Sequence, residues 1–366
     1  MKIAIIGTRG IPNHYGGFEQ FAEYVSVGLV QKGHEVIVYN SHTHPFQGNE
    51  FKGVRIIHCK DPEDKIGTAG QFVYDLNCIL DARKRDFDII LQLGYTSSSI
   101  WSRIFPKKAI LTTNMDGLEW KRTKYSKKVQ KFLQYAESLA IKHSDHLISD
   151  SIGIQNYIQE KYAKSSTYIP YGAHVFENPN PKSLREYSLR EYEYDLLIAR
   201  LEPENSIETI LDGVSQSSGS RPFLVIGKHE TKFGEYLKHK FKSQSKIQFL
   251  GGIYNQEVLN NLRFYSNLYF HGHTVGGTNP SLLEAMASSA LICAHDNIFN
   301  KAILGDDALY FQSTENVKEI LNNSKKDQFT LVLVNNIDKV REIYNWDKII
   351  NDYQDHFVHI MNSLVE

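Results

Sequence analysis

The stretch Gly276-Gly277-Thr278-Asn279-Pro280-Ser281-Leu282-Leu283-Glu284-Ala285-Met286-Ala287 carries the strongest signal in the chain. An apolar strand, Leu268 to Phe270, precedes it, and the glycines then open a helix at Pro280, where a missing N–H is harmless. Backbone N–H groups at such a helix start bind anions, so a diphosphate fits there. Glu284 follows about one turn inside the helix, where a carboxylate can accept both hydroxyls of a ribose. The alternative is a glycine loop before an ordinary core helix with a solvated glutamate.

Length and composition indicate a two-domain protein in a reducing compartment. A chain of 366 residues with 41% hydrophobic content is long enough for two cores. The formal net charge of -1 offers no global attraction to nucleic acid, so we expect no nucleic-acid partner. Cys59, Cys78 and Cys293 are too scattered for a disulfide framework or a zinc site, which favours a cytoplasmic location.

Membrane-spanning and export segments are not expected. Met1 to Gly7 contains only a short apolar run, which predicts a first strand rather than a signal peptide. No run approaches the roughly 20 apolar residues that a membrane span requires. Any membrane contact is therefore expected to be peripheral.

The first half of the chain alternates short apolar runs with helical patterns, which predicts a parallel sheet with helices on both faces. The expected strands are Lys2 to Ile6, Glu35 to Tyr39, Val54 to His58, Ile89 to Leu93, Ala109 to Thr112, and His146 to Ser149. Phe18 to Gln31 has apolar residues at helical spacing and ends at Lys32-Gly33, a helix stop. We expect Tyr168 to Ala173 to be the last strand of this half. The proline-containing stretch from His174 to Lys182 is the expected linker.

The second half repeats this pattern. The expected strands are Tyr194 to Ala199, Phe223 to Ile226, Ile247 to Phe249, Leu268 to His271, Leu291 to Ala294, and Leu309 to Gln312, with helices starting at Ser206, Gly234, Asn255, Pro280 and Thr314. Asp338 to Leu364 is a long amphipathic stretch. The predicted fold class is α/β, with two doubly wound domains at residues 1–175 and 185–346. Ligands are expected at the carboxyl ends of both sheets.

Three motifs together carry a family resemblance. They are the stretch from Gly276, the segment Arg200-Leu201-Glu202-Pro203-Glu204-Asn205, and the front of the chain from Gly7-Thr8-Arg9-Gly10-Ile11-Pro12 to Gly16-Gly17-Phe18-Glu19. In their order along the chain they resemble glycosyltransferase family 4, the retaining two-domain GT-B enzymes, and most of all its bacterial rhamnosyltransferase-like branch. The resemblance implies two Rossmann-like domains facing a central cleft. The first would bind the acceptor and the second the nucleotide sugar, and a last helix, about residues 347–366, would cross back to the first domain.

Two departures from the family pattern affect the expected phosphate and sugar sites. Arg200 follows a strand and is expected to stabilise charge on the leaving diphosphate. The family's lysine five residues later is Asn205 here, so Lys228 is the candidate for compensation, or else a solvated loop lysine. The first glutamate of the family's acidic pair falls on Gly276. Backbone N–H groups, or His273 and Asn279, would then meet the sugar hydroxyls.

The remaining donor contacts come from glycine-containing turns. Gly251-Gly252-Ile253-Tyr254 resembles the family's base-binding turn, with Tyr254 covering a pyrimidine, although a plain turn is the alternative. The expected donor-binding set is Gly16, Gly17, Arg200, Lys228, Gly251, Tyr254, Gly277, Thr278, Asn279 and Glu284. His271 and His273 can face one side of a strand end, but no third metal ligand is identified near them. The resemblance implies that no metal is required.

The N-terminal loop argues against a nicotinamide cofactor. Gly7-Thr8-Arg9-Gly10 lacks the Gly-any-Gly pattern that binds dinucleotides after a first strand. Instead, Asn13 to Gly17 leads into a helix and forms a second anion-binding start. Glu19 is interpreted as a partner of the helix dipole rather than as a catalytic group.

Candidate catalytic and acceptor-binding residues follow strands of the first half. Asp116 is expected to be catalytic or to orient the acceptor, with Glu119, Trp120 and Arg122 binding the acceptor. Asp150 and Tyr171 follow strands that open on the same edge, and either can deprotonate or hold the acceptor hydroxyl. For Asp150 a helix N-cap role before Ile152 is equally open.

A basic and aromatic segment runs from Trp101 to Lys131. Its members are Lys107, Lys108, Lys121, Arg122, Lys124, Lys127 and Lys128, interleaved with Trp101, Phe105, Trp120 and Tyr125. Such a surface suits anionic lipid and a lipid-diphosphate acceptor. The other interpretation is a solvated charged face.

The expected activity is that of a retaining glycosyltransferase in cell-surface polysaccharide synthesis. The best guess is transfer of L-rhamnose from dTDP-L-rhamnose to a lipid-linked saccharide, at the inner face of the cell membrane. The nucleotide sugar, dTDP- or UDP-linked, is a substrate, and no metal or other cofactor is expected. A nucleotide-sugar 2-epimerase and a non-catalytic nucleotide-sugar binder remain as alternatives.

Overall fold

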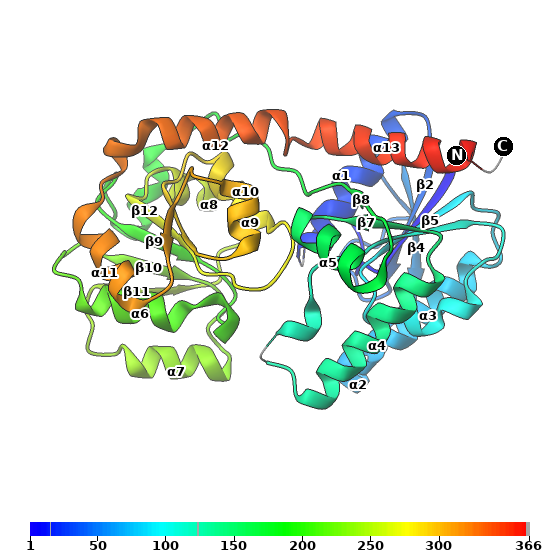
Figure 1. The fold of residues 1–366 in the computed structure, drawn as a ribbon, viewed down its shortest axis with the longest axis horizontal. Helices are drawn as coiled ribbons and strands as arrows, with labels where there is room; N and C mark the ends of the chain where they lie inside the picture. Colours follow the sequence, from blue (N-terminus) through cyan, green and yellow to red (C-terminus); the bar gives the residue numbers. More distant parts are fainter. Residues whose placement is uncertain (15, 123, 364–366) are drawn as a thin grey trace. The chain divides into compact units, whose positions relative to one another are not determined.

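The computed structural model describes residues 1–14, 16–122 and 124–363. The chain divides into two compact units. The N-terminal unit comprises Met1–Lys121, Tyr125–Tyr171 and Trp346–Glu366, and the C-terminal unit comprises Arg122–Lys124 and Gly172–Asn345. Each unit contains one sheet with helices on both of its faces (Figure 1).

The N-terminal unit contains an eight-stranded sheet in the order β3-β4-β2-β1-β5-β6-β7-β8, parallel except for β3. Its strands are β1 (Lys2–Ile6), β2 (Glu35–Ser41), β3 (Glu50–Phe51), β4 (Val54–Cys59), β5 (Ile89–Leu93), β6 (Ile110–Asn114), β7 (His146–Ser149) and β8 (Thr167–Tyr168). Its helices are α1 (Gly17–Gln31), α2 (Glu63–Ile66), α3 (Gly70–Ala82), α4 (Lys127–His143), α5 (Ile152–Tyr162) and α13 (Trp346–Asn362), with short 3-10 turns at η1 (Gly67–Ala69), η2 (Ser99–Ile104) and η3 (Glu119–Lys121).

The C-terminal unit contains a six-stranded, all-parallel sheet in the order β11-β10-β9-β12-β13-β14. Its strands are β9 (Asp195–Ile198), β10 (Phe223–Ile226), β11 (Ile247–Gly251), β12 (Leu268–His271), β13 (Ile292–His295) and β14 (Leu309–Phe311). Its helices are α6 (Ile207–Gln216), α7 (Lys232–Lys240), α8 (Gln256–Phe264), α9 (Pro280–Ala287), α10 (Ile298–Leu304), α11 (Thr314–Asn323) and α12 (Thr330–Glu342), with turns η4 (Pro181–Tyr187), η5 (Pro203–Asn205) and η6 (Lys326–Phe329).

Burial explains why the strands form as they do. The central strands β5 and β6 are buried along their whole lengths, as is typical of parallel strands with helices on both faces. In the C-terminal unit, α6, α7 and α11 pack their apolar faces on one side of the sheet, where they form a core with Phe223 and Phe270. Figure 1 shows α8, α9, α10 and α12 on the other side of that sheet. The strand order reverses beside β9, which makes the β9–β12 edge a topological switch point.

Most predicted strands are confirmed, with ends shifted by one or two residues. One strand prediction is wrong. The stretch Tyr168 to Ala173 is not a strand beyond Tyr168, because Pro170 lacks an N–H and the chain leaves the sheet there. Within the amphipathic stretch that begins at Asp338, α12 ends at Glu342 and α13 begins at Trp346, one residue before the expected start of the last helix at about residue 347. In the break, Tyr344 accepts a hydrogen bond from Ala173 N (2.6 Å) instead of continuing a helix.

Helix α13 packs in the N-terminal unit against α1. Tyr24 stacks on Trp346 with ring centroids 4.5 Å apart, and Phe21 meets Tyr353 edge to face at 5.1 Å. A Cβ at Gly28 would lie 2.4 Å from Ile350 Cδ1, so α13 crosses α1 where only a glycine fits. The expected end of this helix at residue 366 falls partly outside the described residues, since 364–366 are not described.

His356 fixes α13 to the sheet through both of its ring nitrogens. Nε2 lies 3.1 Å from Thr112 Oγ1 and Nδ1 lies 3.2 Å from Thr167 Oγ1. The pKa of His356 is lowered to about 4, mostly by burial of the imidazole and then by His146 and His359. His356 is therefore neutral in the folded unit at pH 7.

The pKa of His356 predicts a loss of stability in mild acid. Its folded value of about 4 lies below its ordinary value of 6.5, so the unfolded chain binds the extra proton as the pH falls through that window. Between pH 7.5 and 4.5 this costs about 2.5 kcal/mol of unfolding free energy. His356→Gln keeps a neutral polar side chain and should remove that part of the acid sensitivity in urea unfolding. The matched change at exposed His239 should leave the slope as in the wild type.

Candidate active site

The loops that follow β9, β10 and β12 approach one another closely at the switch point of the C-terminal sheet. A Cβ at Gly227 would lie 2.0 Å from Ala199 O, and one at Gly272 would lie 2.0 Å from Asn205 O. Only glycine fits at either position, because the contact is with backbone. This packing brings the segment after β9, which carries Arg200, beside the segment after β12, which carries His273.

Arg200 is exposed at this edge, whereas Asn205 is buried at 4% exposure. Asn205 Nδ2 donates to Arg200 O (2.7 Å), so this amide fixes the loop that presents the guanidinium. The position that holds a lysine in the related family is thus an internal structural position here. A charged side chain would be costly there, because its amine would lose its solvation.

Two histidines line the end of β12. His271 is buried, and its ring stacks on that of His273 with centroids 4.3 Å apart. Burial lowers the pKa of His271 well below its ordinary value, and His273 and Arg263 lower it further. Burial also lowers the pKa of His273 to about 3, followed by the charges of Arg200 and Arg122. Both rings are therefore neutral at pH 7, and within the described residues neither ring nitrogen of His271 has a hydrogen-bond partner.

Glu284 on α9, which is half-buried, forms an ion pair with the buried Arg263 from α8. The Arg263 side chain is 1% exposed, and its Nη2 lies 2.7 Å from Glu284 Oε2. The same nitrogen donates to Ser281 Oγ (3.1 Å), which also lies 3.0 Å from Tyr269 OH. Glu284 is in the second turn of α9, not in the first turn, since the helix begins at Pro280. The carboxylate is thus held in one orientation by a partner that the sequence did not reveal.

The start of α9 differs from the expected anion site. Asn279 Oδ1 accepts Ser281 N (2.9 Å), and Asn279 O accepts the N–H groups of Leu282 and Leu283. The N–H groups of Ser281, Leu282 and Leu283 are thus satisfied by Asn279 within the chain, and the expected anion site at this helix start stays a prediction. The glycine turn before the helix is the other stretch of backbone at the expected site. In this turn Gly277 is half-buried and Thr278 is buried. Gly276 has φ +144°, a conformation in which the family's glutamate would be strained.

The other predicted donor residues lie in loops of the same unit. Lys228 is exposed just after Gly227. Gly251 has φ +78° at the end of β11, and its carbonyl accepts Gly227 N (2.9 Å), which joins the two loops. Tyr254 is 83% exposed, so its ring covers nothing within this unit beyond Gly252.

In the N-terminal unit, Glu19 holds the loop between β1 and α1. Its Oε1 accepts Arg9 N (2.9 Å) and Thr8 Oγ1 (3.2 Å), and the side chain is 4% exposed. Glu19 is therefore a structural anchor of the loop rather than only a dipole partner. Gly16 precedes α1 in an extended conformation and Gly17 begins the helix, and both are half-buried.

The predicted acidic residues of the N-terminal unit gather around Tyr171. Burial raises the pKa of Tyr171 well above its ordinary value, and the charges of Asp116, Asp150, Tyr353 and Glu19 raise it further. Asp116 has φ +52°, and its N–H donates to Asn114 Oδ1 (3.1 Å). Asp150 is buried and does not cap α5, because Ser151 accepts Ile154 N as the N-cap. The structure thus brings Asp116, Asp150 and Tyr171 together.

The predicted acceptor-binding residues do not form one group. Trp120 Nε1 donates to Glu137 Oε2 (3.0 Å), and Glu137 is a buried carboxylate that also accepts Tyr157 OH (2.7 Å). Trp120 is therefore part of the packing around Glu137. Glu119 is half-buried at the start of η3. Arg122 is grouped with the C-terminal unit, where its Nη1 lies 3.6 Å from Glu204 Oε1.

A second buried carboxyl was missed by the sequence analysis. Asp75 on α3 is 5% exposed and accepts Ser97 Oγ (2.5 Å). The pKa of Asp75 is raised to about 7, mainly by burial and also by Asp61, although the hydrogen bond from Ser97 lowers it. The sequence signal for such a site is an aspartate on the apolar face of a helix. Asp75 lies on the face of α3 that carries apolar residues at helical spacing.

Because Arg263 and Glu284 form an ion pair, removing only one of the two charges should lower the stability of the fold strongly. Glu284→Leu should lower the unfolding free energy by about 3 kcal/mol or more, because it leaves a buried guanidinium unpaired. The double change Arg263→Met with Glu284→Leu should recover most of that loss in urea unfolding. Glu315→Leu, which removes an exposed pair with Lys318, should cost much less. A Glu284→Leu protein as stable as the wild type would contradict the ion pair's role.

No metal-binding cluster of three or more His, Cys, Asp or Glu side chains occurs among the described residues. Comparison with family models matches residues 1–174 to a domain of unknown function, DUF1972. Comparison with curated protein sequences gives no match.

Solved structures resemble the whole chain. Sucrose-phosphate synthase from Thermosynechococcus elongatus matches with a TM-score of 0.80 and 16% identity, covering 99% of both chains. Anabaena HepE in complex with UDP and glucose matches with a TM-score of 0.75 and 14% identity, covering 98% of this chain and 100% of that one. WaaG, a glycosyltransferase involved in lipopolysaccharide biosynthesis, matches with a TM-score of 0.69 and 13% identity, covering 95% and 98%. The chain therefore has the GT-B fold, with two Rossmann-like units.

Proposed function

We propose that this protein is a retaining glycosyltransferase that uses a nucleotide-sugar donor. The observation that carries the proposal is the chain of charged and polar side chains at the switch point of the C-terminal sheet, which runs from Glu284 through Arg263, His271 and His273 to Arg200. This is the edge where doubly wound sheets bind nucleotides. Proteins with the same fold include HepE, whose structure contains UDP and glucose, and sucrose-phosphate synthase.

The donor is proposed to bind along this chain. Glu284 accepts the ribose hydroxyls while Arg263 holds its Oε2 in place. Arg200 and Lys228, both exposed, neutralise the diphosphate, so that no metal ion is required. The remaining proposed contacts are the turn of Gly277, Thr278 and Asn279 on the sugar side, and Gly251 with Tyr254 on the base.

For the donor sugar we propose L-rhamnose, carried on dTDP. Gly276 removes the carboxylate that the related enzymes direct at a sugar hydroxyl, and a 6-deoxy sugar has fewer hydroxyls to satisfy. His273 is neutral, with a pKa of about 3, so it offers one N–H donor and one acceptor without charge. This pattern suits a hydroxyl of a less polar sugar.

The N-terminal unit is proposed to bind the acceptor, a lipid-linked saccharide. Tyr171 keeps its proton, since its pKa is raised, so it can hold the acceptor by a hydrogen bond but cannot act as a base. That leaves Asp116 and Asp150 to orient or deprotonate the attacking hydroxyl. In a front-face reaction the leaving diphosphate takes part in receiving this proton, and the new bond forms on the face from which the diphosphate departs. Gly16 and Gly17 at the start of α1 are proposed to contact the donor phosphates.

A donor panel tests the activity. The protein should be incubated with dTDP-rhamnose and, in parallel, UDP-GlcNAc, with and without a lipid-linked saccharide. Transfer only when the acceptor is present supports the glycosyltransferase. An epimerised donor without acceptor indicates a 2-epimerase, and binding without turnover indicates a non-catalytic binder. Thermal shifts with each donor would rank their affinities.

Arg200 predicts a large effect on turnover. Arg200→Ala should lower kcat by roughly a hundredfold, because a positioned cation stabilises the charge on the leaving diphosphate. Lys228→Ala is the companion change, and an equal or larger loss there would assign the role to Lys228 instead. Asn205→Lys should not rescue Arg200→Ala, because position 205 is buried. Initial-rate assays at saturating donor distinguish these outcomes.

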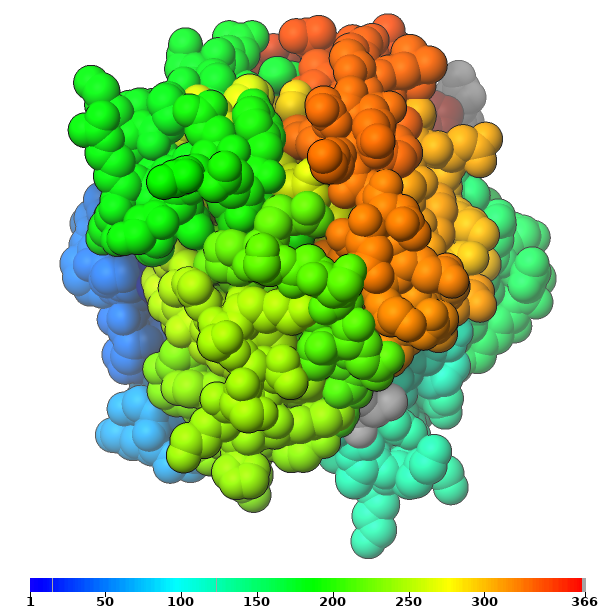
Figure 2. Space-filling view, turned by 90° about the vertical axis from the view of Figure 1, so that its left-hand side faces the viewer, coloured from blue at the N-terminus to red at the C-terminus, as the bar shows by residue number. Residues whose placement is uncertain are grey.

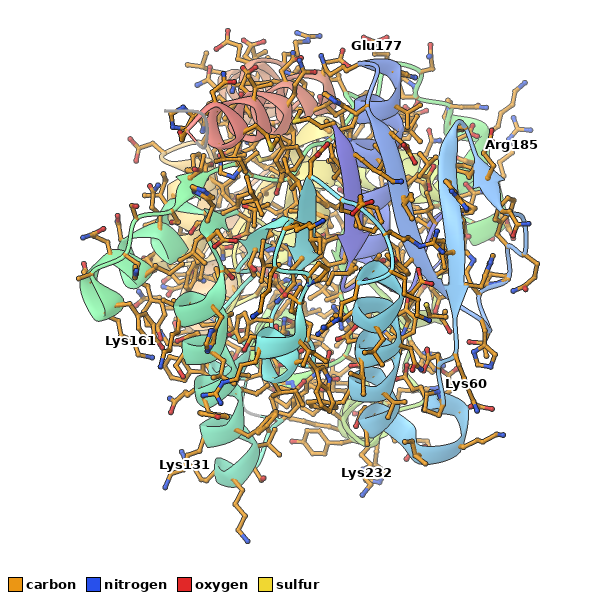
Figure 3. All side chains as sticks on the ribbon, turned by 90° about the vertical axis from the view of Figure 1, so that its right-hand side faces the viewer. Lys60, Lys131, Lys161, Glu177, Arg185 and Lys232 are labelled. Atoms are coloured by element: carbon orange, nitrogen blue, oxygen red, sulfur yellow. The ribbon has the colours of Figure 1, made fainter. Side chains whose placement is uncertain are left out.

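A peripheral membrane location is also proposed, at the inner face of the cell membrane. No described helix is long and apolar enough to span a bilayer. Helix α4 carries Lys127, Lys128 and Lys131 on its exposed side, and Figure 3 shows Lys131 pointing outward from it. Beside them the apolar side chains of Val129, Phe132 and Tyr135 are 39%, 37% and 57% exposed. We define these six residues as the α4 surface, whose combination of cations and apolar groups suits an anionic bilayer.

The α4 surface predicts salt-sensitive vesicle binding. Each lysine near an anionic lipid contributes about 1 kcal/mol, so wild type should co-sediment with anionic vesicles at low salt and less at high salt. Reversing Lys127, Lys128 and Lys131 to glutamate should abolish this binding. Reversing Lys232, Lys238 and Lys242, exposed lysines on and beside α7, gives the control with the same net charge. Equal loss in both triple variants would assign the effect to net charge and not to the α4 surface.

A further inference from the structure

The C-terminal unit has a pocket of about 550 Å³ at the amino ends of its strands, opposite the edge that carries Arg200. Tyr192 precedes β9, Arg221 precedes β10 and Asn267 precedes β12, and all three line the pocket. The other wall is the segment from Lys325 to Thr330. Figure 2 looks onto this part of the surface, where the green and orange segments that line the pocket meet. The proposed glycosyl transfer uses none of these residues.

Lys326 is the unusual group in this pocket. It is 7% exposed, and its Nζ donates to the backbone carbonyl of Phe264. The amine lies 5.4 Å from the ring centroid of Tyr192 and 5.3 Å from that of Phe264. Its backbone N–H donates to Asn267 Oδ1 (3.1 Å), which fixes the segment. Among the described residues no carboxylate forms an ion pair with Lys326.

The amine is neutral to a large extent at physiological pH. Glu193, Arg221, Lys325 and Asp327 line the same pocket, two of each sign, yet burial is the cause that lowers the pKa of Lys326 to about 7. An unprotonated amine has a free electron pair and is a nucleophile, whereas an ordinary lysine is almost wholly protonated at this pH. The pocket gives a small electrophile space beside it.

We propose that Lys326 is a covalent acylation site and that its pocket accepts small acyl phosphates. Lys325 supplies the cation for the phosphate group, because the guanidinium of Arg221 is already paired with Asp195 (3.1 Å). The rings of Tyr192 and Phe264 lie beside the amine. Lys326 Nζ attacks the acyl carbonyl carbon and forms the amide bond. The bond from that carbon to the phosphate oxygen breaks, inorganic phosphate leaves, and the amine proton passes to phosphate or water. This inference is independent of the proposed glycosyltransferase activity.

The modified side chain suits its surroundings better than the amine does. An amide nitrogen retains one N–H, so the hydrogen bond to Phe264 O persists. The amide carries no charge, so burial no longer opposes its presence. Acylation should therefore stabilise the C-terminal unit, and more strongly below pH 7, where the unmodified amine is protonated inside the fold.

The test is acetylation of the full chain by acetyl phosphate, measured by peptide mass spectrometry. Exposed Lys325 is the internal reference, because it is the neighbouring residue. Lys326 should react at least about tenfold faster than Lys325 at pH 7.5, and its rate should level off above about pH 7 while that of Lys325 keeps rising. Equal or slower reaction at Lys326, or a rate that rises to pH 10, would overturn the proposal.

Two variants and a second reagent test the phosphate part. Lys325→Gln should slow acetylation of Lys326 by acetyl phosphate but not by acetic anhydride, whereas Lys325→Arg should leave both rates unchanged. If Lys325→Gln slows neither reagent or slows both equally, the pocket does not recognise phosphate through this cation. Acetylated wild type should have a higher Tm than unmodified protein at pH 6 and a smaller gain at pH 8.5. No gain at pH 6, with Lys326→Arg as the unreactive control, would contradict the burial argument.

Discussion

Close contact between backbone segments at the ends of the central strands shapes both units. In the N-terminal unit, Gly7 has φ +85°, and a Cβ there would lie 2.2 Å from Leu93 O. In the C-terminal unit, Gly227 and Gly272 meet backbone carbonyls at 2.0 Å in the same way. Because no side chain fits in these positions, the loops that follow neighbouring parallel strands lie directly against each other. The side chains of the candidate site, such as Arg200 and His273, extend from the edges of these loops.

The candidate donor site depends on charges that are buried and paired inside the unit. Arg263 is fully enclosed, and its guanidinium supports Glu284, Ser281 and, through Ser281, Tyr269. Burial is the main cause that lowers the pKa values of His271 and His273, and the charges of Arg263 and Arg200, respectively, lower them as well. Burying these charges costs desolvation free energy, so the ion pair adds little net stability to the fold. Its hydrogen bonds instead hold the side chains in one fixed geometry. The carboxylate and the imidazoles are thereby oriented before any ligand arrives.

The sequence predicted the strands well because buried parallel strands have short apolar runs with clear ends. It failed where tertiary contacts override local pattern. Tyr168 to Ala173 looks extended, but Ala173 forms an isolated bridge with Asn345, far along the chain, and donates its N–H to Tyr344 O instead of extending β8. Arg263 gave no signal because its partner Glu284 is 21 residues away on another helix. Asn205 was recognised as a departure from the family, but only its burial shows that the residue is a loop anchor.

The position of α13 has a consequence for how the protein is made. Residues 172–345 are an insertion within the N-terminal unit, since α13 follows them in sequence and packs on α1. The match to the family domain ends at residue 174, so that segment by itself lacks the helix that covers Phe21 and Gly28. During synthesis the C-terminal unit is complete in the chain before the N-terminal one. The apolar side of α1 is therefore exposed to solvent or to chaperones until α13 has been synthesised and can pack on it.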